Sequence, residues 1–219
     1  MPTVPQPVVW GIHGGKDGAA DSLFLREGCI ALGWDRVGDL TDLPNDREVF
    51  KTRLSAVYPE MKPGAIPLTA GQLYRFVYEM ADGDLVAYPS VVDRQIHIGK
   101  VEGGYQHIPS SQPVYPNIRR VKWRASVART SFTQGALYEI GSAMSLFQIR
   151  NYYEEFVQAH DGMAPPTPMP EDSTAAEVSQ SIEEGTRDFV LKRLSQELKG
   201  HPLTDFVAHL LGTMGYRKR

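Results

Sequence analysis

A proline-rich segment near the C-terminus limits how this chain can fold. Residues 161–175 read DGMAPPTPMPEDSTA, with four prolines and few apolar side chains that could pack. Proline lacks a backbone donor and interrupts helices, and this composition is typical of a linker. We therefore predict three parts: a body over residues 1–160, a linker over 161–175 and a tail over 176–219.

Composition excludes several classes of protein. The net charge of −3 argues against a histone-like binder of polyanions, and the single cysteine, Cys29, excludes a disulfide framework and a cysteine-based zinc site. The six histidines show no HxxH or HExxH spacing, so we expect no metal centre in this chain. No run of 18 apolar residues and no secretory signal is present, so we expect no membrane partner and a cytoplasmic location.

The body reads as a mixture of strands and helices. Apolar and alternating runs predict strands at residues 8–12, 30–34, 84–88, 95–101 and 119–127. Capping patterns predict helices that begin near Asn45, Thr69 and Ser131, and a further helix runs through Leu146, Phe147 and Tyr153. This order predicts an α+β fold, with a small curved or barrel-like sheet and peripheral helices.

The tail reads as two helices. The second carries apolar residues at helical spacing on one face: Leu203, Phe206, Val207, Leu210, Leu211 and Met214. Two helices alone cannot cover such a stripe well, so the tail suggests either the start of a further domain or a homodimer interface.

The predicted strand over residues 119–127 has one apolar and one basic side. Val121, Trp123, Ala125 and Val127 alternate with Arg120, Lys122, Arg124 and Ser126. A strand with a basic face suits phosphates, although an exposed sheet edge kept soluble by charge has the same pattern. We take Arg120, Lys122 and Arg124 as candidate phosphate ligands, with Lys16 and Arg94 as further candidates.

Aromatic residues lie in or at the ends of predicted strands. The commoner fate of such residues is core packing, which Trp123 fits best. Trp34 differs, because it ends an apolar run and is followed at once by Asp35 and Arg36. An aromatic side chain beside polar groups suits a stacking wall for a planar ligand such as a base. His13, in a glycine-flanked loop after the first strand, is a second candidate for a pocket.

Four segments of the body carry a resemblance to a known family. They read VWGIH at 9–13, IALGWD at 30–35, GDLVAY at 83–88 and IGKV at 98–101. In this order they resemble EVE-type domains of the PUA-like superfamily, which are related in fold to YTH modules. The resemblance implies a small curved sheet with an aromatic-lined pocket that, in relatives acting in restriction, takes a modified base flipped out of DNA. It places the base pocket at Trp34, Tyr88, His13 and Ser90, with Tyr105 as a further aromatic candidate, and Trp10 is a weaker pocket candidate from its position in the first predicted strand.

The tail carries a second resemblance. Residues 204–216, TDFVAHLLGTMGY, resemble the opening of an Mrr-type restriction endonuclease domain. In that family the helix precedes a PD-(D/E)xK catalytic core, whose acidic residues and lysine are absent here. The resemblance implies a fuller parent protein with a Mg²⁺-dependent nuclease after the reader, and no cofactor in this chain.

The sequence therefore favours a module that reads a modified base in double-stranded DNA for a restriction endonuclease. An RNA-binding PUA-like module is the alternative, since folds of this superfamily also read RNA. A nuclease activity of this chain itself is disfavoured, because no catalytic constellation is visible in it.

Overall fold

The structure is a computed structural model that describes residues 8–109 and 115–163, together with residues 206, 209, 211 and 213. The chain divides into two units, Met1–Pro168 and Met169–Arg219. In the second unit only the four separate residues are described, and all are helical. The predicted linker over 161–175 and tail over 176–219 otherwise lie outside the described residues.

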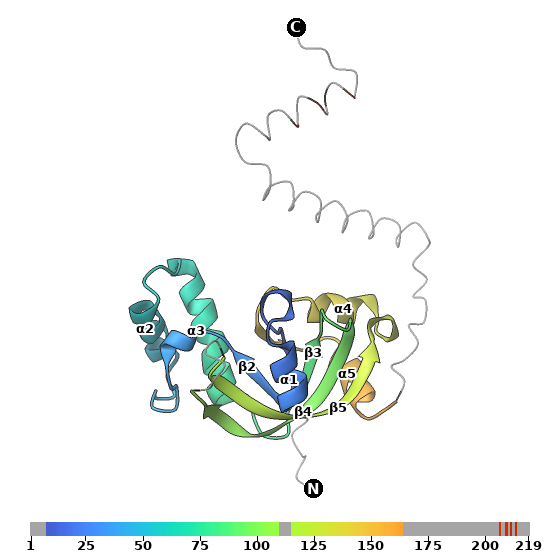
Figure 1. Ribbon diagram of the computed structural model, residues 1–219, viewed down its shortest axis with the longest axis horizontal. Coiled ribbons are helices and arrows are strands. Elements are labelled where there is room, and N and C mark those ends of the chain that lie inside the picture. Colours follow the sequence, from blue (N-terminus) through green and yellow to red (C-terminus); the bar gives the residue numbers. More distant parts are fainter. Residues whose placement is uncertain are drawn as a thin grey trace. The chain divides into compact units, whose positions relative to one another are not determined.

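The first unit contains six strands and five α-helices in its described part (Figure 1). The strands are β1 (Val9–Ile12), β2 (Cys29–Leu32), β3 (Leu85–Pro89), β4 (Gln95–His107), β5 (Asn117–Ala128) and β6 (Leu146–Ile149). The helices are α1 (Asp21–Glu27), α2 (Arg47–Val57), α3 (Ile66–Tyr74), α4 (Gln134–Ile140) and α5 (Tyr153–His160). A π-helix, η4 (Arg75–Glu79), continues directly from α3.

The strands form one sheet in the order β2-β5-β4-β3-β1-β6. Strand β1 runs parallel to β3, and every other neighbouring pair is antiparallel. The predicted mixture of α and β elements is confirmed. The sheet is open, because its edge strands β2 and β6 do not pair with each other.

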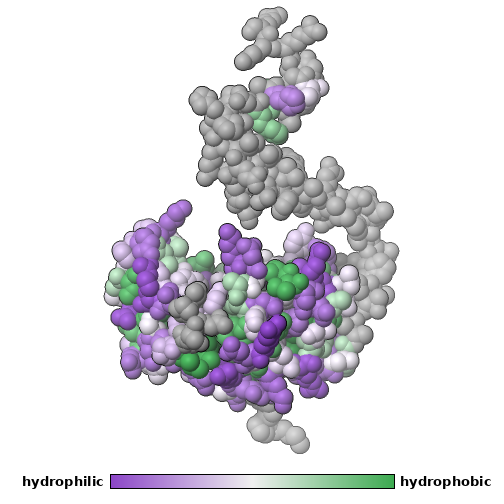
Figure 2. All heavy atoms as spheres, viewed as in Figure 1, coloured by the Kyte–Doolittle hydropathy of each residue, from purple (hydrophilic) through white to green (hydrophobic). Residues whose placement is uncertain are grey.

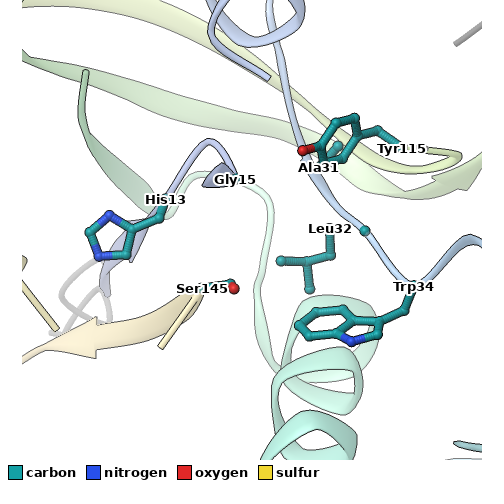
Figure 3. Close-up of a pocket in the computed structure, with 8 residues that line it drawn as sticks. His13, Gly15, Ala31, Leu32, Trp34, Tyr115 and Ser145 are labelled. Carbon is teal, nitrogen blue, oxygen red and sulfur yellow. The ribbon is translucent and has the colours of Figure 1, made fainter. Parts of the chain in front are cut away.

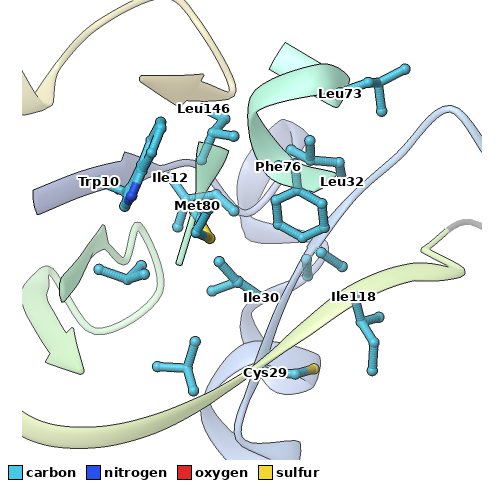
Figure 4. Close-up of a cluster of buried hydrophobic side chains, with 14 of the residues drawn as sticks. Trp10, Ile12, Cys29, Ile30, Leu32, Leu73, Phe76, Met80, Ile118 and Leu146 are labelled. Atoms are coloured by element: carbon cyan, nitrogen blue, oxygen red, sulfur yellow. The ribbon is translucent and has the colours of Figure 1, made fainter. Parts of the chain in front are cut away.

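A hydrophobic cluster lies on each face of the sheet. The larger cluster joins the sheet to α1, α2, α3 and η4, and Figure 4 shows Trp10, Ile30, Phe76 and Leu146 converging in it. The two edge strands, β2 and β6, therefore both contribute to one core. The end of β2 lies near the end of β1 and the start of β6. The second cluster joins the other face to α4 and α5 through Phe132 and Phe156, whose rings stack with centroids 5.0 Å apart.

The structure corrects several predicted boundaries. The predicted helix through Leu146 and Phe147 is wrong: these residues form edge strand β6, paired antiparallel with β1, and the helix begins only at Tyr153. Helix α2 is capped by Asp46, whose carboxylate accepts the Glu48 N–H, instead of by Asn45. Helix α4 is likewise capped by Thr133 instead of Ser131.

A β-bulge in β5 breaks the predicted alternation. Trp123 pairs with Gly99, whereas Ala125 pairs with the preceding residue, Ile98, so Arg124 is an extra residue in the strand. Trp123 consequently packs on the larger cluster, while Ala125 and Val127 pack on the other face. The prediction of one continuous apolar side over residues 121–127 is therefore wrong.

Polar residues dominate the visible face of the body, with small apolar areas between them (Figure 2). Within the ranges that the structure describes, no helix combines the length and apolar character needed to cross a membrane.

Candidate functional site

A cavity of about 230 Å³ opens where β1 and β2 end (Figure 3). Strand β1 leads into the loop that carries His13 and Gly15, and β2 leads into Gly33 and Trp34. The other walls come from Tyr115, two residues before β5, and from Ser145, directly before β6. The lining residues are His13, Gly15, Ala31, Leu32, Gly33, Trp34, Tyr115 and Ser145.

Trp34 forms one wall in an unusual backbone conformation. Its φ of 61° lies in the left-handed region, which a bulky side chain enters only at an energetic cost. The following residues hold it there: the Tyr58 hydroxyl accepts the Arg36 N–H at 3.1 Å and donates to the Asp35 carboxylate at 3.3 Å. The Arg36 guanidinium stacks 3.9 Å from the Tyr58 ring centroid and pairs with Glu60. The half-buried indole is thus held in place from the α2 side of the loop.

Tyr115 forms another wall, close to the backbone of Gly15. Gly15 has a φ of 76°, and a Cβ at this position would collide with the Tyr115 hydroxyl oxygen. Only glycine fits both the backbone angle and the close approach. The position next in sequence is Lys16, which is exposed and does not line the cavity.

His13 lies on the opposite side of the cavity from Trp34, and its ring is directed away from the indole (Figure 3). The ring Nε2 donates to the Ser142 carbonyl oxygen over 2.8 Å. Burial lowers the pKa of His13 below its usual value, and the nearby Arg129 acts in the same direction. In the neutral ring the proton is therefore on Nε2, and Nδ1 is an acceptor.

Three of the predicted pocket residues belong to the core instead. Trp10 is completely buried, and its Nε1 donates to the Asp84 carboxylate at 2.8 Å. Tyr88 is buried as well, and its hydroxyl donates to Asp21 Oδ1 at 2.9 Å. Ser90 is buried beside it and donates to the same oxygen. None of these side chains can stack on a ligand without opening the core, so their assignment to the pocket is corrected.

Tyr105, the further aromatic candidate, also lies outside the cavity. Its hydroxyl donates to Asn117 Oδ1 at 2.6 Å and accepts the Leu40 N–H at 3.1 Å. Burial raises the pKa of this phenol to about 12. Tyr105 thus connects β4 to β5 and to the loop before α2.

The candidate phosphate ligands are exposed but dispersed. Arg120 and Lys122 lie on one face of β5, where Lys122 is directly opposite the exposed Lys100, and Arg124 lies at the bulge. Arg120 pairs with Cys29, where β2 begins, whereas the cavity lies where β2 ends. Arg94 lies in the turn between β3 and β4 and does not line the cavity. Of the five candidates, only Lys16 adjoins the cavity in sequence.

Sequence reasoning missed most of the cavity wall. Trp34 and His13 were found because each follows the end of a strand. Tyr115 and Ser145 carry no local signal, since they reach the cavity only through the pairing of β5 and β6 with distant strands.

Neither metal nor thiol chemistry is indicated in the part of the chain that the structure describes. That part contains no group of three or more His, Cys, Asp or Glu side chains that could hold a metal ion. Cys29 is buried, and burial raises the pKa of its thiol to about 11, which keeps it protonated at neutral pH.

The region that holds this cavity matches one known protein family. Residues 10–150 match a family described as a domain of unknown function, DUF8426. The chain belongs to the DUF8426 family. The matched range includes all eight residues that line the cavity, so the cavity is part of the DUF8426 domain. No curated protein and no solved structure matches the chain.

Proposed function

We propose that this chain is the DNA-reading module of a modification-dependent restriction endonuclease, and that its cavity takes a modified base flipped out of the duplex. The observation that carries this proposal is the cavity itself, with Trp34 and Tyr115 in its wall and an exposed lysine, Lys16, next in sequence to the lining residue Gly15. The resemblance of the body to EVE-type, PUA-like domains and of the tail to Mrr-type nucleases gives the proposal its biological setting.

The dimensions of the cavity suit one heterocycle. A volume of about 230 Å³ is below the roughly 300–1,000 Å³ typical of sites for drug-sized ligands. A flat base can stack on an aromatic wall, and such stacking contributes about 1–3 kcal/mol per base. This gain offsets the few kcal/mol that extrusion of a base from the duplex costs.

Polar groups at the cavity can read the edge of the base. The lining includes Ser145, whose hydroxyl can donate to or accept from a base edge, and His13, whose Nδ1 is an acceptor in the neutral ring and reaches a base only if the ring turns toward the cavity. Lys16, which follows the lining residue Gly15 and is exposed, suits a phosphate near the flipped nucleotide. Phosphate contacts position the strand, and contacts inside the cavity select the base.

A binding panel tests the proposal. Duplexes of one sequence carry a single 5-methylcytosine, 5-hydroxymethylcytosine or N6-methyladenine, or no modification, and their Kd values are measured at one salt concentration. We expect one modified duplex to bind about tenfold or more tightly than the unmodified one. Equal Kd values across the panel contradict the proposal. Displacement of the preferred duplex by unmodified single-stranded RNA at lower concentration supports the RNA-binding alternative instead.

A further inference from the structure

We propose that the turn between β3 and β4, with Val91 and Val92 at its tip, is an apolar wedge that enters the duplex beside the flipped base. This inference rests on the proposed function and adds a second contact to it. The turn comprises residues 90–94, between Pro89 and Gln95.

Two adjacent valines are exposed at the tip. Val91 is 59% exposed and Val92 is 65% exposed, a degree of exposure that few large hydrophobic residues in the described ranges reach. A single exposed apolar side chain is ordinary, but an adjacent pair at a protruding turn is a feature of binding surfaces.

Buried polar groups hold this turn in one conformation. The Ser90 Oγ accepts the N–H groups of Val92 and Asp93, at 3.1 and 3.3 Å, and donates to Asp21. Burying a hydroxyl such as that of Ser90 is costly unless it is hydrogen-bonded, and here its bonds fix the backbone of the turn.

A second set of bonds fixes the other side of the turn. Asp93 Oδ1 accepts the Gln95 N–H at 2.9 Å, and its Oδ2 lies 2.8 Å from Nε2 of the buried His97. His97 Nδ1 in turn lies 2.8 Å from the Ser126 Oγ on β5. Exposed turns are usually the mobile parts of a domain, so a turn braced in this way is suited to insertion.

The tip packs against the segment that follows the cavity-lining residue Gly15. Gly18 contacts both valines, and a Cβ on it would lie 2.8 Å from Cγ2 of Val91. Gly15, which lines the cavity, is three residues away, a span of at most about 11 Å. The charged side chains around the tip are two basic ones, Lys16 and Arg94, and three acidic ones, Asp17, Asp21 and Asp93, so the contact that the tip offers is apolar and not an attraction to phosphates.

Duplex DNA is the occupant that this arrangement fits. A base that leaves the stack leaves a gap between its neighbours, and proteins that deform DNA fill such steps with apolar side chains. Two valines on a hydrogen-bonded turn near a cavity for the extruded base can fill the gap while the base is held. The valines then contribute to affinity for duplex DNA, whose stack must be opened, and not to affinity for single-stranded DNA.

The test compares duplex with single-stranded DNA. The full chain, its double variant Val91→Ser/Val92→Ser and the control Leu68→Ser are assayed on the modified duplex that the wild type prefers in the panel. Leu68 is also exposed, at 54%, but lies on α3. The same modified strand is assayed alone. We expect the double variant to lose about tenfold in affinity for the duplex, less than twofold for the single strand, and the control to lose neither.

The outcomes separate the wedge from the proposed function. Unchanged duplex affinity in the double variant, with Trp34→Ala still abolishing the preference for the modified duplex, overturns the wedge and leaves the function standing. An equal loss on both forms of DNA also overturns the wedge, because the valines then contact something other than the opened stack. If the wild type prefers no modified DNA, the proposed function and the wedge fall together.

Discussion

The backbone of Trp34 is strained, and this strain gives a first prediction. The left-handed conformation costs an L-residue roughly 1–2 kcal/mol, whereas glycine adopts it freely. Trp34→Ala and Trp34→Gly both remove the indole, but only alanine retains the backbone strain. We expect the glycine variant to be more stable than the alanine variant by about 1 kcal/mol in urea unfolding. Equal unfolding midpoints would show that this loop relaxes without cost.

The lowered pKa of His13 predicts that the stability of the fold depends on pH. Because burial lowers its pKa, the folded state binds a proton less readily than the unfolded state does. Its contribution to stability is therefore intact above the ordinary histidine pKa of about 6.5 and is lost as the pH falls toward the lowered value. His13→Gln keeps a donor for the Ser142 carbonyl but cannot titrate. We expect the variant to lose less stability than the wild type between pH 7 and pH 5, and parallel losses would refute this role.

At the scale of residues, the sequence predicted those cavity residues that directly follow a single strand in the chain. Trp34 and His13 follow strands β2 and β1, and the end of a strand can be predicted from the sequence. Tyr88 and Ser90 also lie at the end of a strand, yet both are buried, and their hydroxyls donate to Asp21 at the start of α1. Which side of a strand end faces a cavity depends on neighbours that are distant in sequence.

Arg119 joins β5 to η4 and β4, so we expect its replacement to lower the stability of the fold strongly. Its buried guanidinium donates to the Phe76, Val77 and Gly103 carbonyl oxygens at 2.6, 2.9 and 3.0 Å, which ties η4 to β4 and β5. Burial lowers its pKa to about 10, so it remains charged at neutral pH. Arg119→Met leaves these carbonyls without their donor.

We expect Arg119→Met to reduce the free energy of unfolding by about 3 kcal/mol, measured by urea denaturation. Arg120→Met at the neighbouring, exposed position is the matched control and should change it by about 0.5 kcal/mol or less. Similar losses in both variants would mean that the buried hydrogen bonds add nothing beyond those of a surface arginine.

At the scale of elements, the sequence identified five of the six strands and misread the sixth. Period-two alternation located β5, but nothing in that pattern marks Arg124 as an inserted residue, so the side chains after it were placed on the wrong face. Strand β6 is only four residues long, and its apolar run also fits a helix. Pairing with β1, a contact distant in sequence, decides between them.

In the whole molecule, the cavity lies at the end of edge strand β2, and the basic side chains lie on β5, which pairs with β2. Arg120 is opposite Cys29 and the cavity reaches Leu32, a separation of about 10 Å along β2. This separation is well within one turn of a DNA duplex, about 34 Å, so one duplex can contact both.

The combined change Arg120→Ala/Lys122→Ala/Arg124→Ala tests that arrangement. We expect weaker binding of modified and unmodified duplexes alike, and a salt dependence that is flatter by about 0.9 log unit for each phosphate that the variant no longer neutralises. The ratio of the two Kd values should stay the same, because these side chains do not line the cavity. An unchanged salt slope would show that this edge does not touch the DNA backbone.

The most direct test of the central claim is the ratio of Kd for unmodified and modified duplex, measured for the wild type, Trp34→Ala and Tyr138→Ala. Tyr138 is an aromatic residue on α4 that is 60% exposed and lies outside the cavity, so it controls for the loss of a surface aromatic. The account predicts a ratio of about ten or more for the wild type and for Tyr138→Ala, and a ratio near one for a folded Trp34→Ala variant. A folded Trp34→Ala variant that keeps the wild-type ratio would contradict it.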